Sequence, residues 1–336
     1  MNNKQAEINA IVQGLMALYS QTFNTHVFFQ KSMAESYLIY VRNAESSTRK
    51  LIQSMALEYM EASIKELNVK NINEKERSFN VLISKKKMPY IDSHRIKGNI
   101  VVPGVTIVDL GLRAFMSYNP LYKVVRCNNS TIKKGIQLGD NETQLFIIKC
   151  IENGEFVDVS FLSQKGELHY TCKIYRNSFV NKPNIHIENF ENRKMSKWPY
   201  DVNEAYNKYL FHGKYFRSIK ELKGVSEDGA SAVLFGSIDL EWPDGNYAID
   251  QAVIDGGGQL QILWGQFLDG RLSLPVYIES VIVYNFGLLK GPIYVELEKV
   301  SANELKKVAN IYYFDTNGDL ICELRGLTLY TISNIT

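Results

Sequence analysis

The stretch that decides the fold is His94-Arg95-Ile96-Lys97-Gly98-Asn99-Ile100-Val101-Val102-Pro103-Gly104, which leads into an apolar run ending at Met116. Proline is suited to the start of a helix because its φ angle is already helical and its missing N–H is not needed there. Glycine lets the backbone pass close to another group. The pattern predicts a buried helix directly downstream of a lone histidine.

Composition restricts the class of protein. The chain has 336 residues, enough for one large domain or two of ordinary size, with 45% hydrophobic and 22% charged residues. These fractions are typical of a globular protein. The formal net charge is only +2, which argues against a nucleic-acid-binding protein with a strongly basic surface.

The cysteines and the N-terminus indicate a cytoplasmic protein. Cys127, Cys150, Cys172 and Cys322 are far apart and form no CxxC pair, which argues against a zinc site or a disulfide framework and suits a reducing compartment. The N-terminus lacks the layout of a signal peptide, and no stretch approaches the roughly 18 apolar residues of a membrane span. We expect neither a bound metal nor a membrane.

Residues 1–77 are expected to be helical. Their apolar side chains recur with the 3.6-residue period of one helix face, and this region has no proline and a single glycine. The residues of the first series are Ile8, Ile11, Val12, Leu15, Met16 and Tyr19.

The remaining chain reads as two similar α+β halves, residues 78–190 and 191–336. Each half has a buried helix, predicted near 105–116 and near 250–264, followed by strands rich in β-branched and aromatic residues. The closing hairpins share a glycine followed by an acid and a leucine, Gly166-Glu167-Leu168 and Gly318-Asp319-Leu320. We interpret this as two copies of one unit, a helix wrapped by an antiparallel sheet.

Three motifs in matching order give the chain a family resemblance. His94, Gly98 and Pro103-Gly104 form HxxxGxxxxPG, which resembles the dehydratase motif of polyketide synthases and related fatty-acid assembly lines. Asp250 to Gln259 resembles the family's HPALLDxxxQ, with Asp250 and Gln251 in place of histidine and proline. We expect these two departures to alter the turn before the helix.

The third motif lies between the other two. Tyr206 to Arg217 resembles LxYGPxF, and more closely the LFHGPxF form of the polyunsaturated-fatty-acid and enediyne synthases, with Lys214 in place of proline. Family analogy makes this segment a strand that borders the active-site tunnel. Taken alone, however, His212 reads as a satisfied structural histidine. The resemblance implies a tandem double hot-dog fold preceded by the N-terminal helical segment.

The resemblance also implies chemistry, the removal of water from a 3-hydroxyacyl thioester to give the 2,3-enoyl thioester. His94 is the expected base, kept neutral by apolar surroundings, and Asp255 is the expected acid, kept protonated by burial. Gln259 lies one helical turn from Asp255 and faces the same way. Residues expected to contact substrate are Gly98, Pro103, Gly104, Val105, His212, Gly213 and Phe216.

Partners follow from the same resemblance. The substrate is expected on the phosphopantetheine arm of an acyl carrier protein, with other synthase domains nearby, a homodimer left open, and no further cofactor. A basic rim drawn from Lys85, Lys86, Lys87, Lys214 and Arg217 is a hypothetical docking patch. Three alternatives stay open: a double-bond isomerase or cyclase using the same His/Asp pair, a hot-dog thioesterase, and a non-catalytic scaffold of a synthase complex.

Overall fold

The computed structural model describes residues 70–73, 75–118, 125–175 and 182–331. The helical segment expected before residue 70 lies outside these ranges. The described end of that segment differs from the prediction, because residues 70–73 and 76–77 are in β-strands. The second of these strands pairs from its first residue, Glu76, with Ile151 of a central strand, and this pairing extends the sheet upstream of the expected start at residue 78.

One large antiparallel sheet runs through both halves. Its strands are β1 (Lys70–Asn73), β2 (Glu76–Ile83), β5 (Val125–Ile132), β7 (Gln144–Asn153), β8 (Phe156–Ser163), β9 (Leu168–Tyr175), β10 (Ile219–Ser226), β11 (Gly229–Leu234), β12 (Ser273–Val283), β13 (Ile293–Ala302), β14 (Lys306–Phe314) and β15 (Leu320–Thr331). Their spatial order is β1-β2-β7-β8-β9-β5-β12-β15-β14-β13-β11-β10.

Within this sheet, the two halves meet at a single strand pair. Strands of the first half occupy one side of the order and strands of the second half the other, and β5 pairs with β12 between them. In that pair Cys127 lies opposite Val281. The two predicted units are therefore parts of one continuous sheet, closed by backbone hydrogen bonds between the halves.

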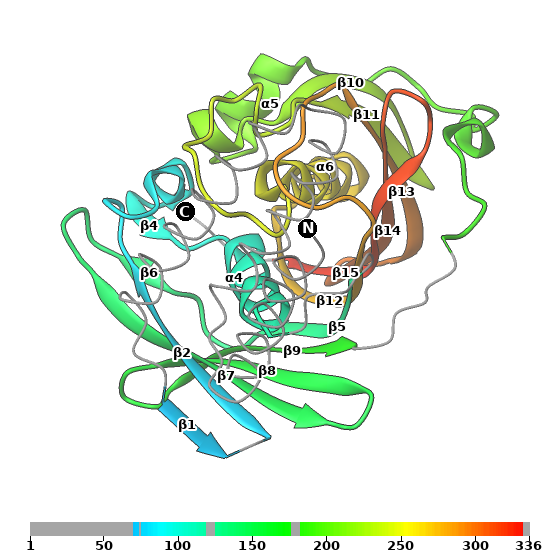
Figure 1. Cartoon of the computed structure of the whole chain (residues 1–336). Helices are drawn as coiled ribbons and strands as arrows, with labels where there is room; N and C mark the ends of the chain where they lie inside the picture. Colours follow the sequence, from blue (N-terminus) through cyan, green and yellow to red (C-terminus); the bar gives the residue numbers. More distant parts are fainter. Residues whose placement is uncertain (1–69, 74, 119–124, 176–181, 332–336) are drawn as a thin grey trace, which may run out of the picture.

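Each half wraps one central helix, as the double hot-dog fold requires. Figure 1 shows α4 (Gly104–Met116) against the strands of the first half and α6 (Gln251–Asp269) against those of the second. Ten of the 13 residues of α4 and 13 of the 19 residues of α6 are buried, so both helices are enclosed rather than lying on the surface with one apolar face. The sequence prediction of the fold is confirmed.

Two glycines of α6 allow this enclosure. A Cβ atom on Gly256 would overlap the Ser218 hydroxyl oxygen, and one on Gly257 would overlap the Tyr313 hydroxyl oxygen. Only glycine permits such close approach of a helix to the strands around it. This contact explains the unusual Gly256-Gly257 pair in a helix interior without a phosphate-binding loop.

The short elements lie around the ends of the central helices. They are the 3₁₀ helices η1 (Pro89–Ser93), η2 (Ile187–Phe190) and η3 (Lys214–Phe216), the helix α5 (Val202–Lys208), and the small sheet of β3 (Arg95–Ile96), β4 (Asn99–Val101) and β6 (Gln137–Leu138).

The segment from Tyr206 to Arg217 is not the strand that the resemblance implies. It comprises the end of α5, an isolated bridge between His212 and His94, and η3. Asp201 caps α5 by accepting a hydrogen bond from the Glu204 N–H at 2.8 Å, which favours helix at the start of the segment.

The segment that connects the halves already packs against the second half before the expected boundary at residues 190/191. Phe190 packs against Tyr312, with 5.3 Å between their ring centroids, and His186 forms an isolated bridge with Asp319. Residues on the first side of the expected 190/191 boundary thus contact the second half. In the described ranges no helix has both the length and the apolar character needed to cross a membrane.

Candidate active site

His94 is fixed by a hydrogen bond at one of its two ring nitrogens. It follows η1, and its Nδ1–H donates to the Val101 carbonyl at 2.7 Å. Since a carbonyl only accepts, Nε2 carries the lone pair in the neutral ring. Burial, and then the charge of His212, lower the pKa of His94 to about 4. The imidazole is therefore neutral near pH 7, as the sequence predicts.

Asp255 lies in the first turns of α6. Its Oδ2 accepts a hydrogen bond from the Gln259 side-chain amide at 2.7 Å and lies 3.2 Å from His212 Nε2. Burial raises the pKa of Asp255, but the charge and hydrogen bond of His212, followed by His94 and Gln259, outweigh it and leave the pKa below its usual value. The expectation that burial keeps this carboxyl protonated is wrong, because a basic side chain lies beside it.

His212 is that basic side chain, and reading it as a structural histidine missed its contact. Its ring centroid lies 5.3 Å from that of His94, to which the isolated bridge ties it. Its side chain is 2% exposed. The only signal in the sequence is its position in the LFHGPxF-like segment, directly before Gly213.

Gln259 is fixed by a buried network. Its side-chain oxygen accepts from the Tyr206 hydroxyl at 2.7 Å, and its amide donates to the Phe216 carbonyl at 2.7 Å as well as to Asp255. The Tyr206 hydroxyl in turn accepts from the Ile219 N–H at 2.9 Å. With both ends of the amide assigned, Gln259 acts on Asp255 as a donor.

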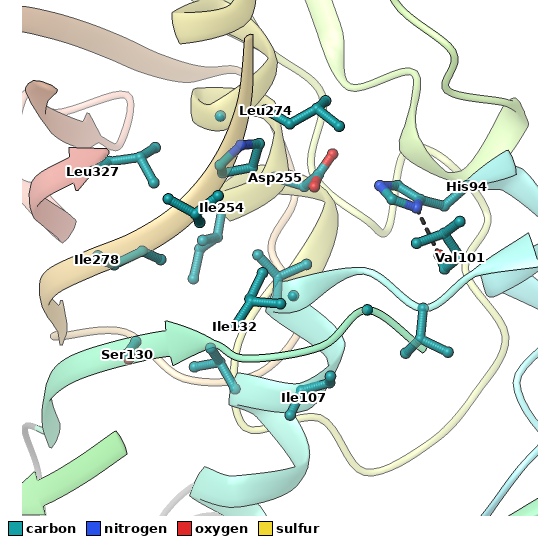
Figure 2. Close-up of a pocket in the computed structure, with 18 of the residues that line it drawn as sticks. His94, Val101, Ile107, Ser130, Ile132, Ile254, Asp255, Leu274, Ile278 and Leu327 are labelled. Carbon is teal, nitrogen blue, oxygen red and sulfur yellow. Dashed lines mark hydrogen bonds between the residues drawn. The ribbon is translucent and has the colours of Figure 1, made fainter. Parts of the chain in front are cut away.

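A cavity of about 240 Å³ is lined by His94 and Asp255 and by other residues of both central helices. Figure 2 shows the His94 ring and the Asp255 carboxylate directed toward each other, with aliphatic side chains along the remaining wall. Residues of both halves form this wall, among them Ile107, Ile132, Ile254, Ile278 and Leu327. A site of this kind accommodates an apolar chain next to two polar groups.

Of the predicted substrate contacts, Gly104, Val105 and His212 line the cavity. Gly258 also lines it, and a Cβ there would meet nothing within 4 Å. The first N–H groups of a helix have no partner within the helix. The start of α4, where Gly104 and Val105 lie, therefore brings backbone donors and a partial positive charge to the cavity.

The other four predicted contacts are not in the cavity wall, and each has another role. Gly98 has φ +83° in the β3–β4 turn, a conformation that favours glycine. Pro103 precedes α4 as its N-cap residue. Gly213 packs on Ser93, because a Cβ there would lie 3.1 Å from the Ser93 Cα. Phe216 contributes its carbonyl to Gln259.

The departures from the family motif orient α6. Asp250 is the N-cap residue, accepting from the Val253 N–H at 2.9 Å and from the Ser237 hydroxyl at 2.6 Å. Gln251 accepts from the Thr106 hydroxyl of α4 at 2.6 Å. Both residues thus fix the start of the helix that carries Asp255, in agreement with the expected effect on the turn.

The three polar groups of the site lie close together. In the part of the chain that the structure describes, side-chain nitrogen and oxygen atoms of His94, His212 and Asp255 lie within 4.8 Å of one another. Distances of this length suit proton transfer through a bound substrate.

Comparisons with known proteins find chains of similar fold. Residues 66–164 match a family model described as the polyketide synthase dehydratase domain. No curated protein matches the chain. Among solved structures, the dehydratase domain from the CurF module of curacin polyketide synthase has 19% sequence identity and a TM-score of 0.69, covering 80% of this chain and 97% of that one.

Two further structures are similar. The dehydratase domain of a mycocerosic acid synthase-like polyketide synthase has 15% identity and a TM-score of 0.66, covering 80% of this chain and 95% of that chain. An N-terminal dehydratase from the difficidin assembly line has 16% identity and a TM-score of 0.64, covering 78% and 96%. At such identities the likeness establishes the fold.

Proposed function

Because this chain belongs to the polyketide synthase dehydratase family, we propose that His94 and Asp255 are the base and the acid that remove water from its 3-hydroxyacyl thioester substrate. The observation that carries the assignment is their arrangement. An imidazole with one free nitrogen and a carboxylate with one uncommitted oxygen face each other at the end of an aliphatic cavity. Elimination needs a base and an acid on either side of one carbon–carbon bond.

The base is His94. Its neutral Nε2 takes the proton from the α-carbon, and the Val101 carbonyl stabilises the imidazolium that forms by accepting from Nδ1–H. The N-terminus of α4 supports this step. Backbone N–H groups near Gly104 and Val105 stabilise the negative charge that develops on the thioester oxygen as the proton leaves.

Asp255 acts at the departing hydroxyl. His212 and Gln259 both approach its Oδ2, so Oδ1 is the oxygen left to meet the substrate. The Cα–H bond breaks with its proton moving to His94, the carbon–carbon double bond forms, and the C–O bond breaks as the hydroxyl takes a proton from the Asp255 carboxyl group and leaves as water. No redox step occurs, and we propose that no redox cofactor takes part.

The acyl group is carried by an acyl carrier protein in this proposal. The aliphatic wall suits the acyl chain, while a thioester on a phosphopantetheine arm reaches the cavity from outside. We propose a homodimer within a larger synthase as the setting. The four cysteines are free thiols and buried, which suits a reducing cytoplasm.

A basic rim near the site is proposed to help the carrier protein dock. Lys86, Lys87 and Arg217 are exposed, whereas Lys85 and Lys214 are ion-paired, with Asp92 at 3.0 Å and Glu241 at 2.7 Å. Changing Lys86 and Lys87 to glutamate should raise KM for the carrier-bound substrate at unchanged kcat, less so at high salt. An unchanged KM at low salt would remove this rim from the proposal.

Intact mass spectrometry tests the central proposal. A 3-hydroxyacyl carrier protein is incubated with the wild type, with His94→Ala and with Asp255→Asn, and circular dichroism verifies that each variant is folded. Loss of one water with the wild type alone supports both assignments. Release of free carrier thiol would identify a thioesterase instead. An unchanged mass with measurable carrier binding would indicate an isomerase or a scaffold.

A further inference from the structure

We propose that His212 is a proton-holding partner of Asp255, so that the two side chains together store the one proton that leaves with the hydroxyl group. This inference rests on the proposed dehydratase function and assigns a role to a residue outside the base–acid pair. His212 acts through Asp255, and we therefore regard it as a positioning residue.

His212 and Asp255 are in direct contact inside the protein. His212 Nε2 lies 3.2 Å from Asp255 Oδ2, and both side chains are largely buried, with 2% and 16% exposed. A carboxylate buried without a partner is costly, and a basic group at hydrogen-bond distance is what allows it to stay ionised. The contact therefore places one mobile proton between the two groups.

His212 differs from His94 in the surroundings of its Nδ1 atom. The Nδ1–H of His94 is committed to the Val101 carbonyl, which fixes its tautomer. His212 Nδ1 is buried and has no hydrogen-bond partner among the described residues. Among the described residues, Asp255 is therefore the one side chain at hydrogen-bond distance from a ring nitrogen of His212. One histidine is built as a base of fixed orientation and the other as half of a coupled pair.

The charged and titratable groups around the pair are few in the described chain. His94 lies beside it, with its ring centroid 5.3 Å from that of His212. From α5, Tyr206 reaches it through Gln259, and Arg217 stacks on the Tyr206 ring at 4.8 Å. From β14, Tyr313 donates to the Ile254 carbonyl at 2.9 Å. Since burial raises the pKa of both tyrosines, neither exchanges protons near neutral pH.

The proton balance is then complete. At the start the His212–Asp255 pair holds one proton and His94 holds none at Nε2. The α-proton moves to His94 Nε2 and the double bond forms. The C–O bond breaks as the Asp255 carboxyl group gives the proton of the pair to the hydroxyl, which leaves as water. At the end His94 is an imidazolium, and the pair consists of a neutral imidazole and a carboxylate. Proton exchange with solvent restores the starting state.

The test is the pH profile of kcat/KM for dehydration by the wild type and by His212→Gln. We expect the variant's active range to narrow from both sides. On the alkaline side Asp255 loses its proton-sharing partner, so activity is lost at lower pH. On the acidic side the charge of His212 no longer lowers the pKa of His94. Beyond each limb, activity should fall about tenfold per pH unit.

Two further variants complete the experiment. His212→Tyr keeps a donor for Asp255 without a positive charge, so its profile should narrow in the same way. His169→Gln removes another buried histidine, whose Nδ1 donates to the Lys134 carbonyl at 3.1 Å, and should leave both limbs in place.

The inference would be overturned if both His212 variants had a lower maximal kcat/KM but acidic and alkaline limbs at the same pH as the wild type. That is the effect expected of a purely structural role. The proposed function would survive that result, provided that His94→Ala and Asp255→Asn still abolish loss of water. Retained dehydration in those two variants would instead remove the proposed function itself.

Discussion

The two central helices carry an aspartate at corresponding places, and the two aspartates have opposite roles. In α4, Asp109 lies two residues before Gly111, and in α6, Asp255 lies two residues before Gly257. Asp109 is completely buried and accepts hydrogen bonds from the N–H groups of Ala248 and Ile249 at 2.7 and 3.2 Å. It therefore anchors the chain that leads into α6.

The surroundings of each carboxyl group explain the difference. Burial raises the pKa of Asp109 to about 6 despite Arg113, whose guanidinium lies 3.6 Å away, and two backbone donors. Asp255 faces an imidazole and a cavity, and its pKa is lowered. Two similar units thus each carry an aspartate at this place, and its partners differ. Asp109 is bound by backbone N–H groups, whereas Asp255, our proposed acid, faces an imidazole and a cavity.

The largest expected difference is in activity. Asp255→Asn should lower kcat by about 10²–10⁴, the usual contribution of an acid or base in the reaction. Asp109→Asn keeps an acceptor for both N–H groups and should lower kcat by less than about tenfold, through small shifts of α6. Steady-state dehydration rates of the two variants measure this, and equal losses would contradict the comparison.

The next difference is in stability. Asp109→Ala leaves the N–H groups of Ala248 and Ile249 buried without their acceptor, at about 1–3 kcal/mol each in free energy of unfolding. Asp109→Asn should be nearer to wild type. Urea unfolding monitored by circular dichroism provides the measurement. If alanine and asparagine are equally destabilising, the carboxyl oxygen is not the anchor.

The same residue predicts a pH dependence of stability. Its pKa is about 6 in the folded protein against 3.8 for an ordinary aspartate, so the folded state binds more protons between these two values. The contribution of Asp109 to stability should therefore fall as pH rises from about 4 to 6. In Asp109→Asn the urea midpoint should no longer fall over this pH range. If it falls as in the wild type, another group causes the pH dependence.

The glycines sharpen the comparison of the helices. A Cβ on Gly257 would overlap the Tyr313 hydroxyl, whereas one on Gly111 would make an ordinary 3.5 Å contact with Val159. Gly257→Ala should destabilise the fold by about 1–3 kcal/mol, and Gly111→Ala should be tolerated. Thermal unfolding tests both variants, and an unaffected Gly257→Ala would contradict the close packing around α6.

Gly258 offers the matched test within α6. Its position is open toward the cavity, so Gly258→Ala should stabilise the helix by up to about 1 kcal/mol while placing a methyl group where substrate binds. We expect an unchanged or higher melting temperature together with a raised KM. A lowered melting temperature would show that Gly258 is packed like Gly257.

The smallest expected effect is on the acidic side of the wild-type pH profile. The pKa of His94 is about 4, against 6.5 for an ordinary histidine. Since the base must be neutral, kcat/KM should change little between about pH 5 and 6.5 and fall only below that range. A limb near 6.5 would mean that the reacting base is not the buried, neutral His94.

Local patterns were sufficient for the two central helices and for naming the two residues that we propose as base and acid. The apolar spacing around Pro103-Gly104 predicted α4, that after Asp250 predicted α6, and the motifs identified His94 and Asp255. Such signals depend on residues a few positions apart, whose backbone and side-chain preferences are written in the chain itself. The strands and the two-unit architecture follow from the same local periodicity.

Only the tertiary structure decided how these groups act. His212 and Asp255 lie 43 residues apart (212 against 255) and Asp109 and Ala248 lie 139 apart, and no local pattern indicates that either pair meets. Burial alone argued for a protonated Asp255, whereas the neighbouring imidazole of His212 lowers the pKa of this carboxyl group. Ionisation in a protein interior depends on which groups the fold brings within hydrogen-bond distance. Here the packing of one sheet around two helices brings His212 next to Asp255.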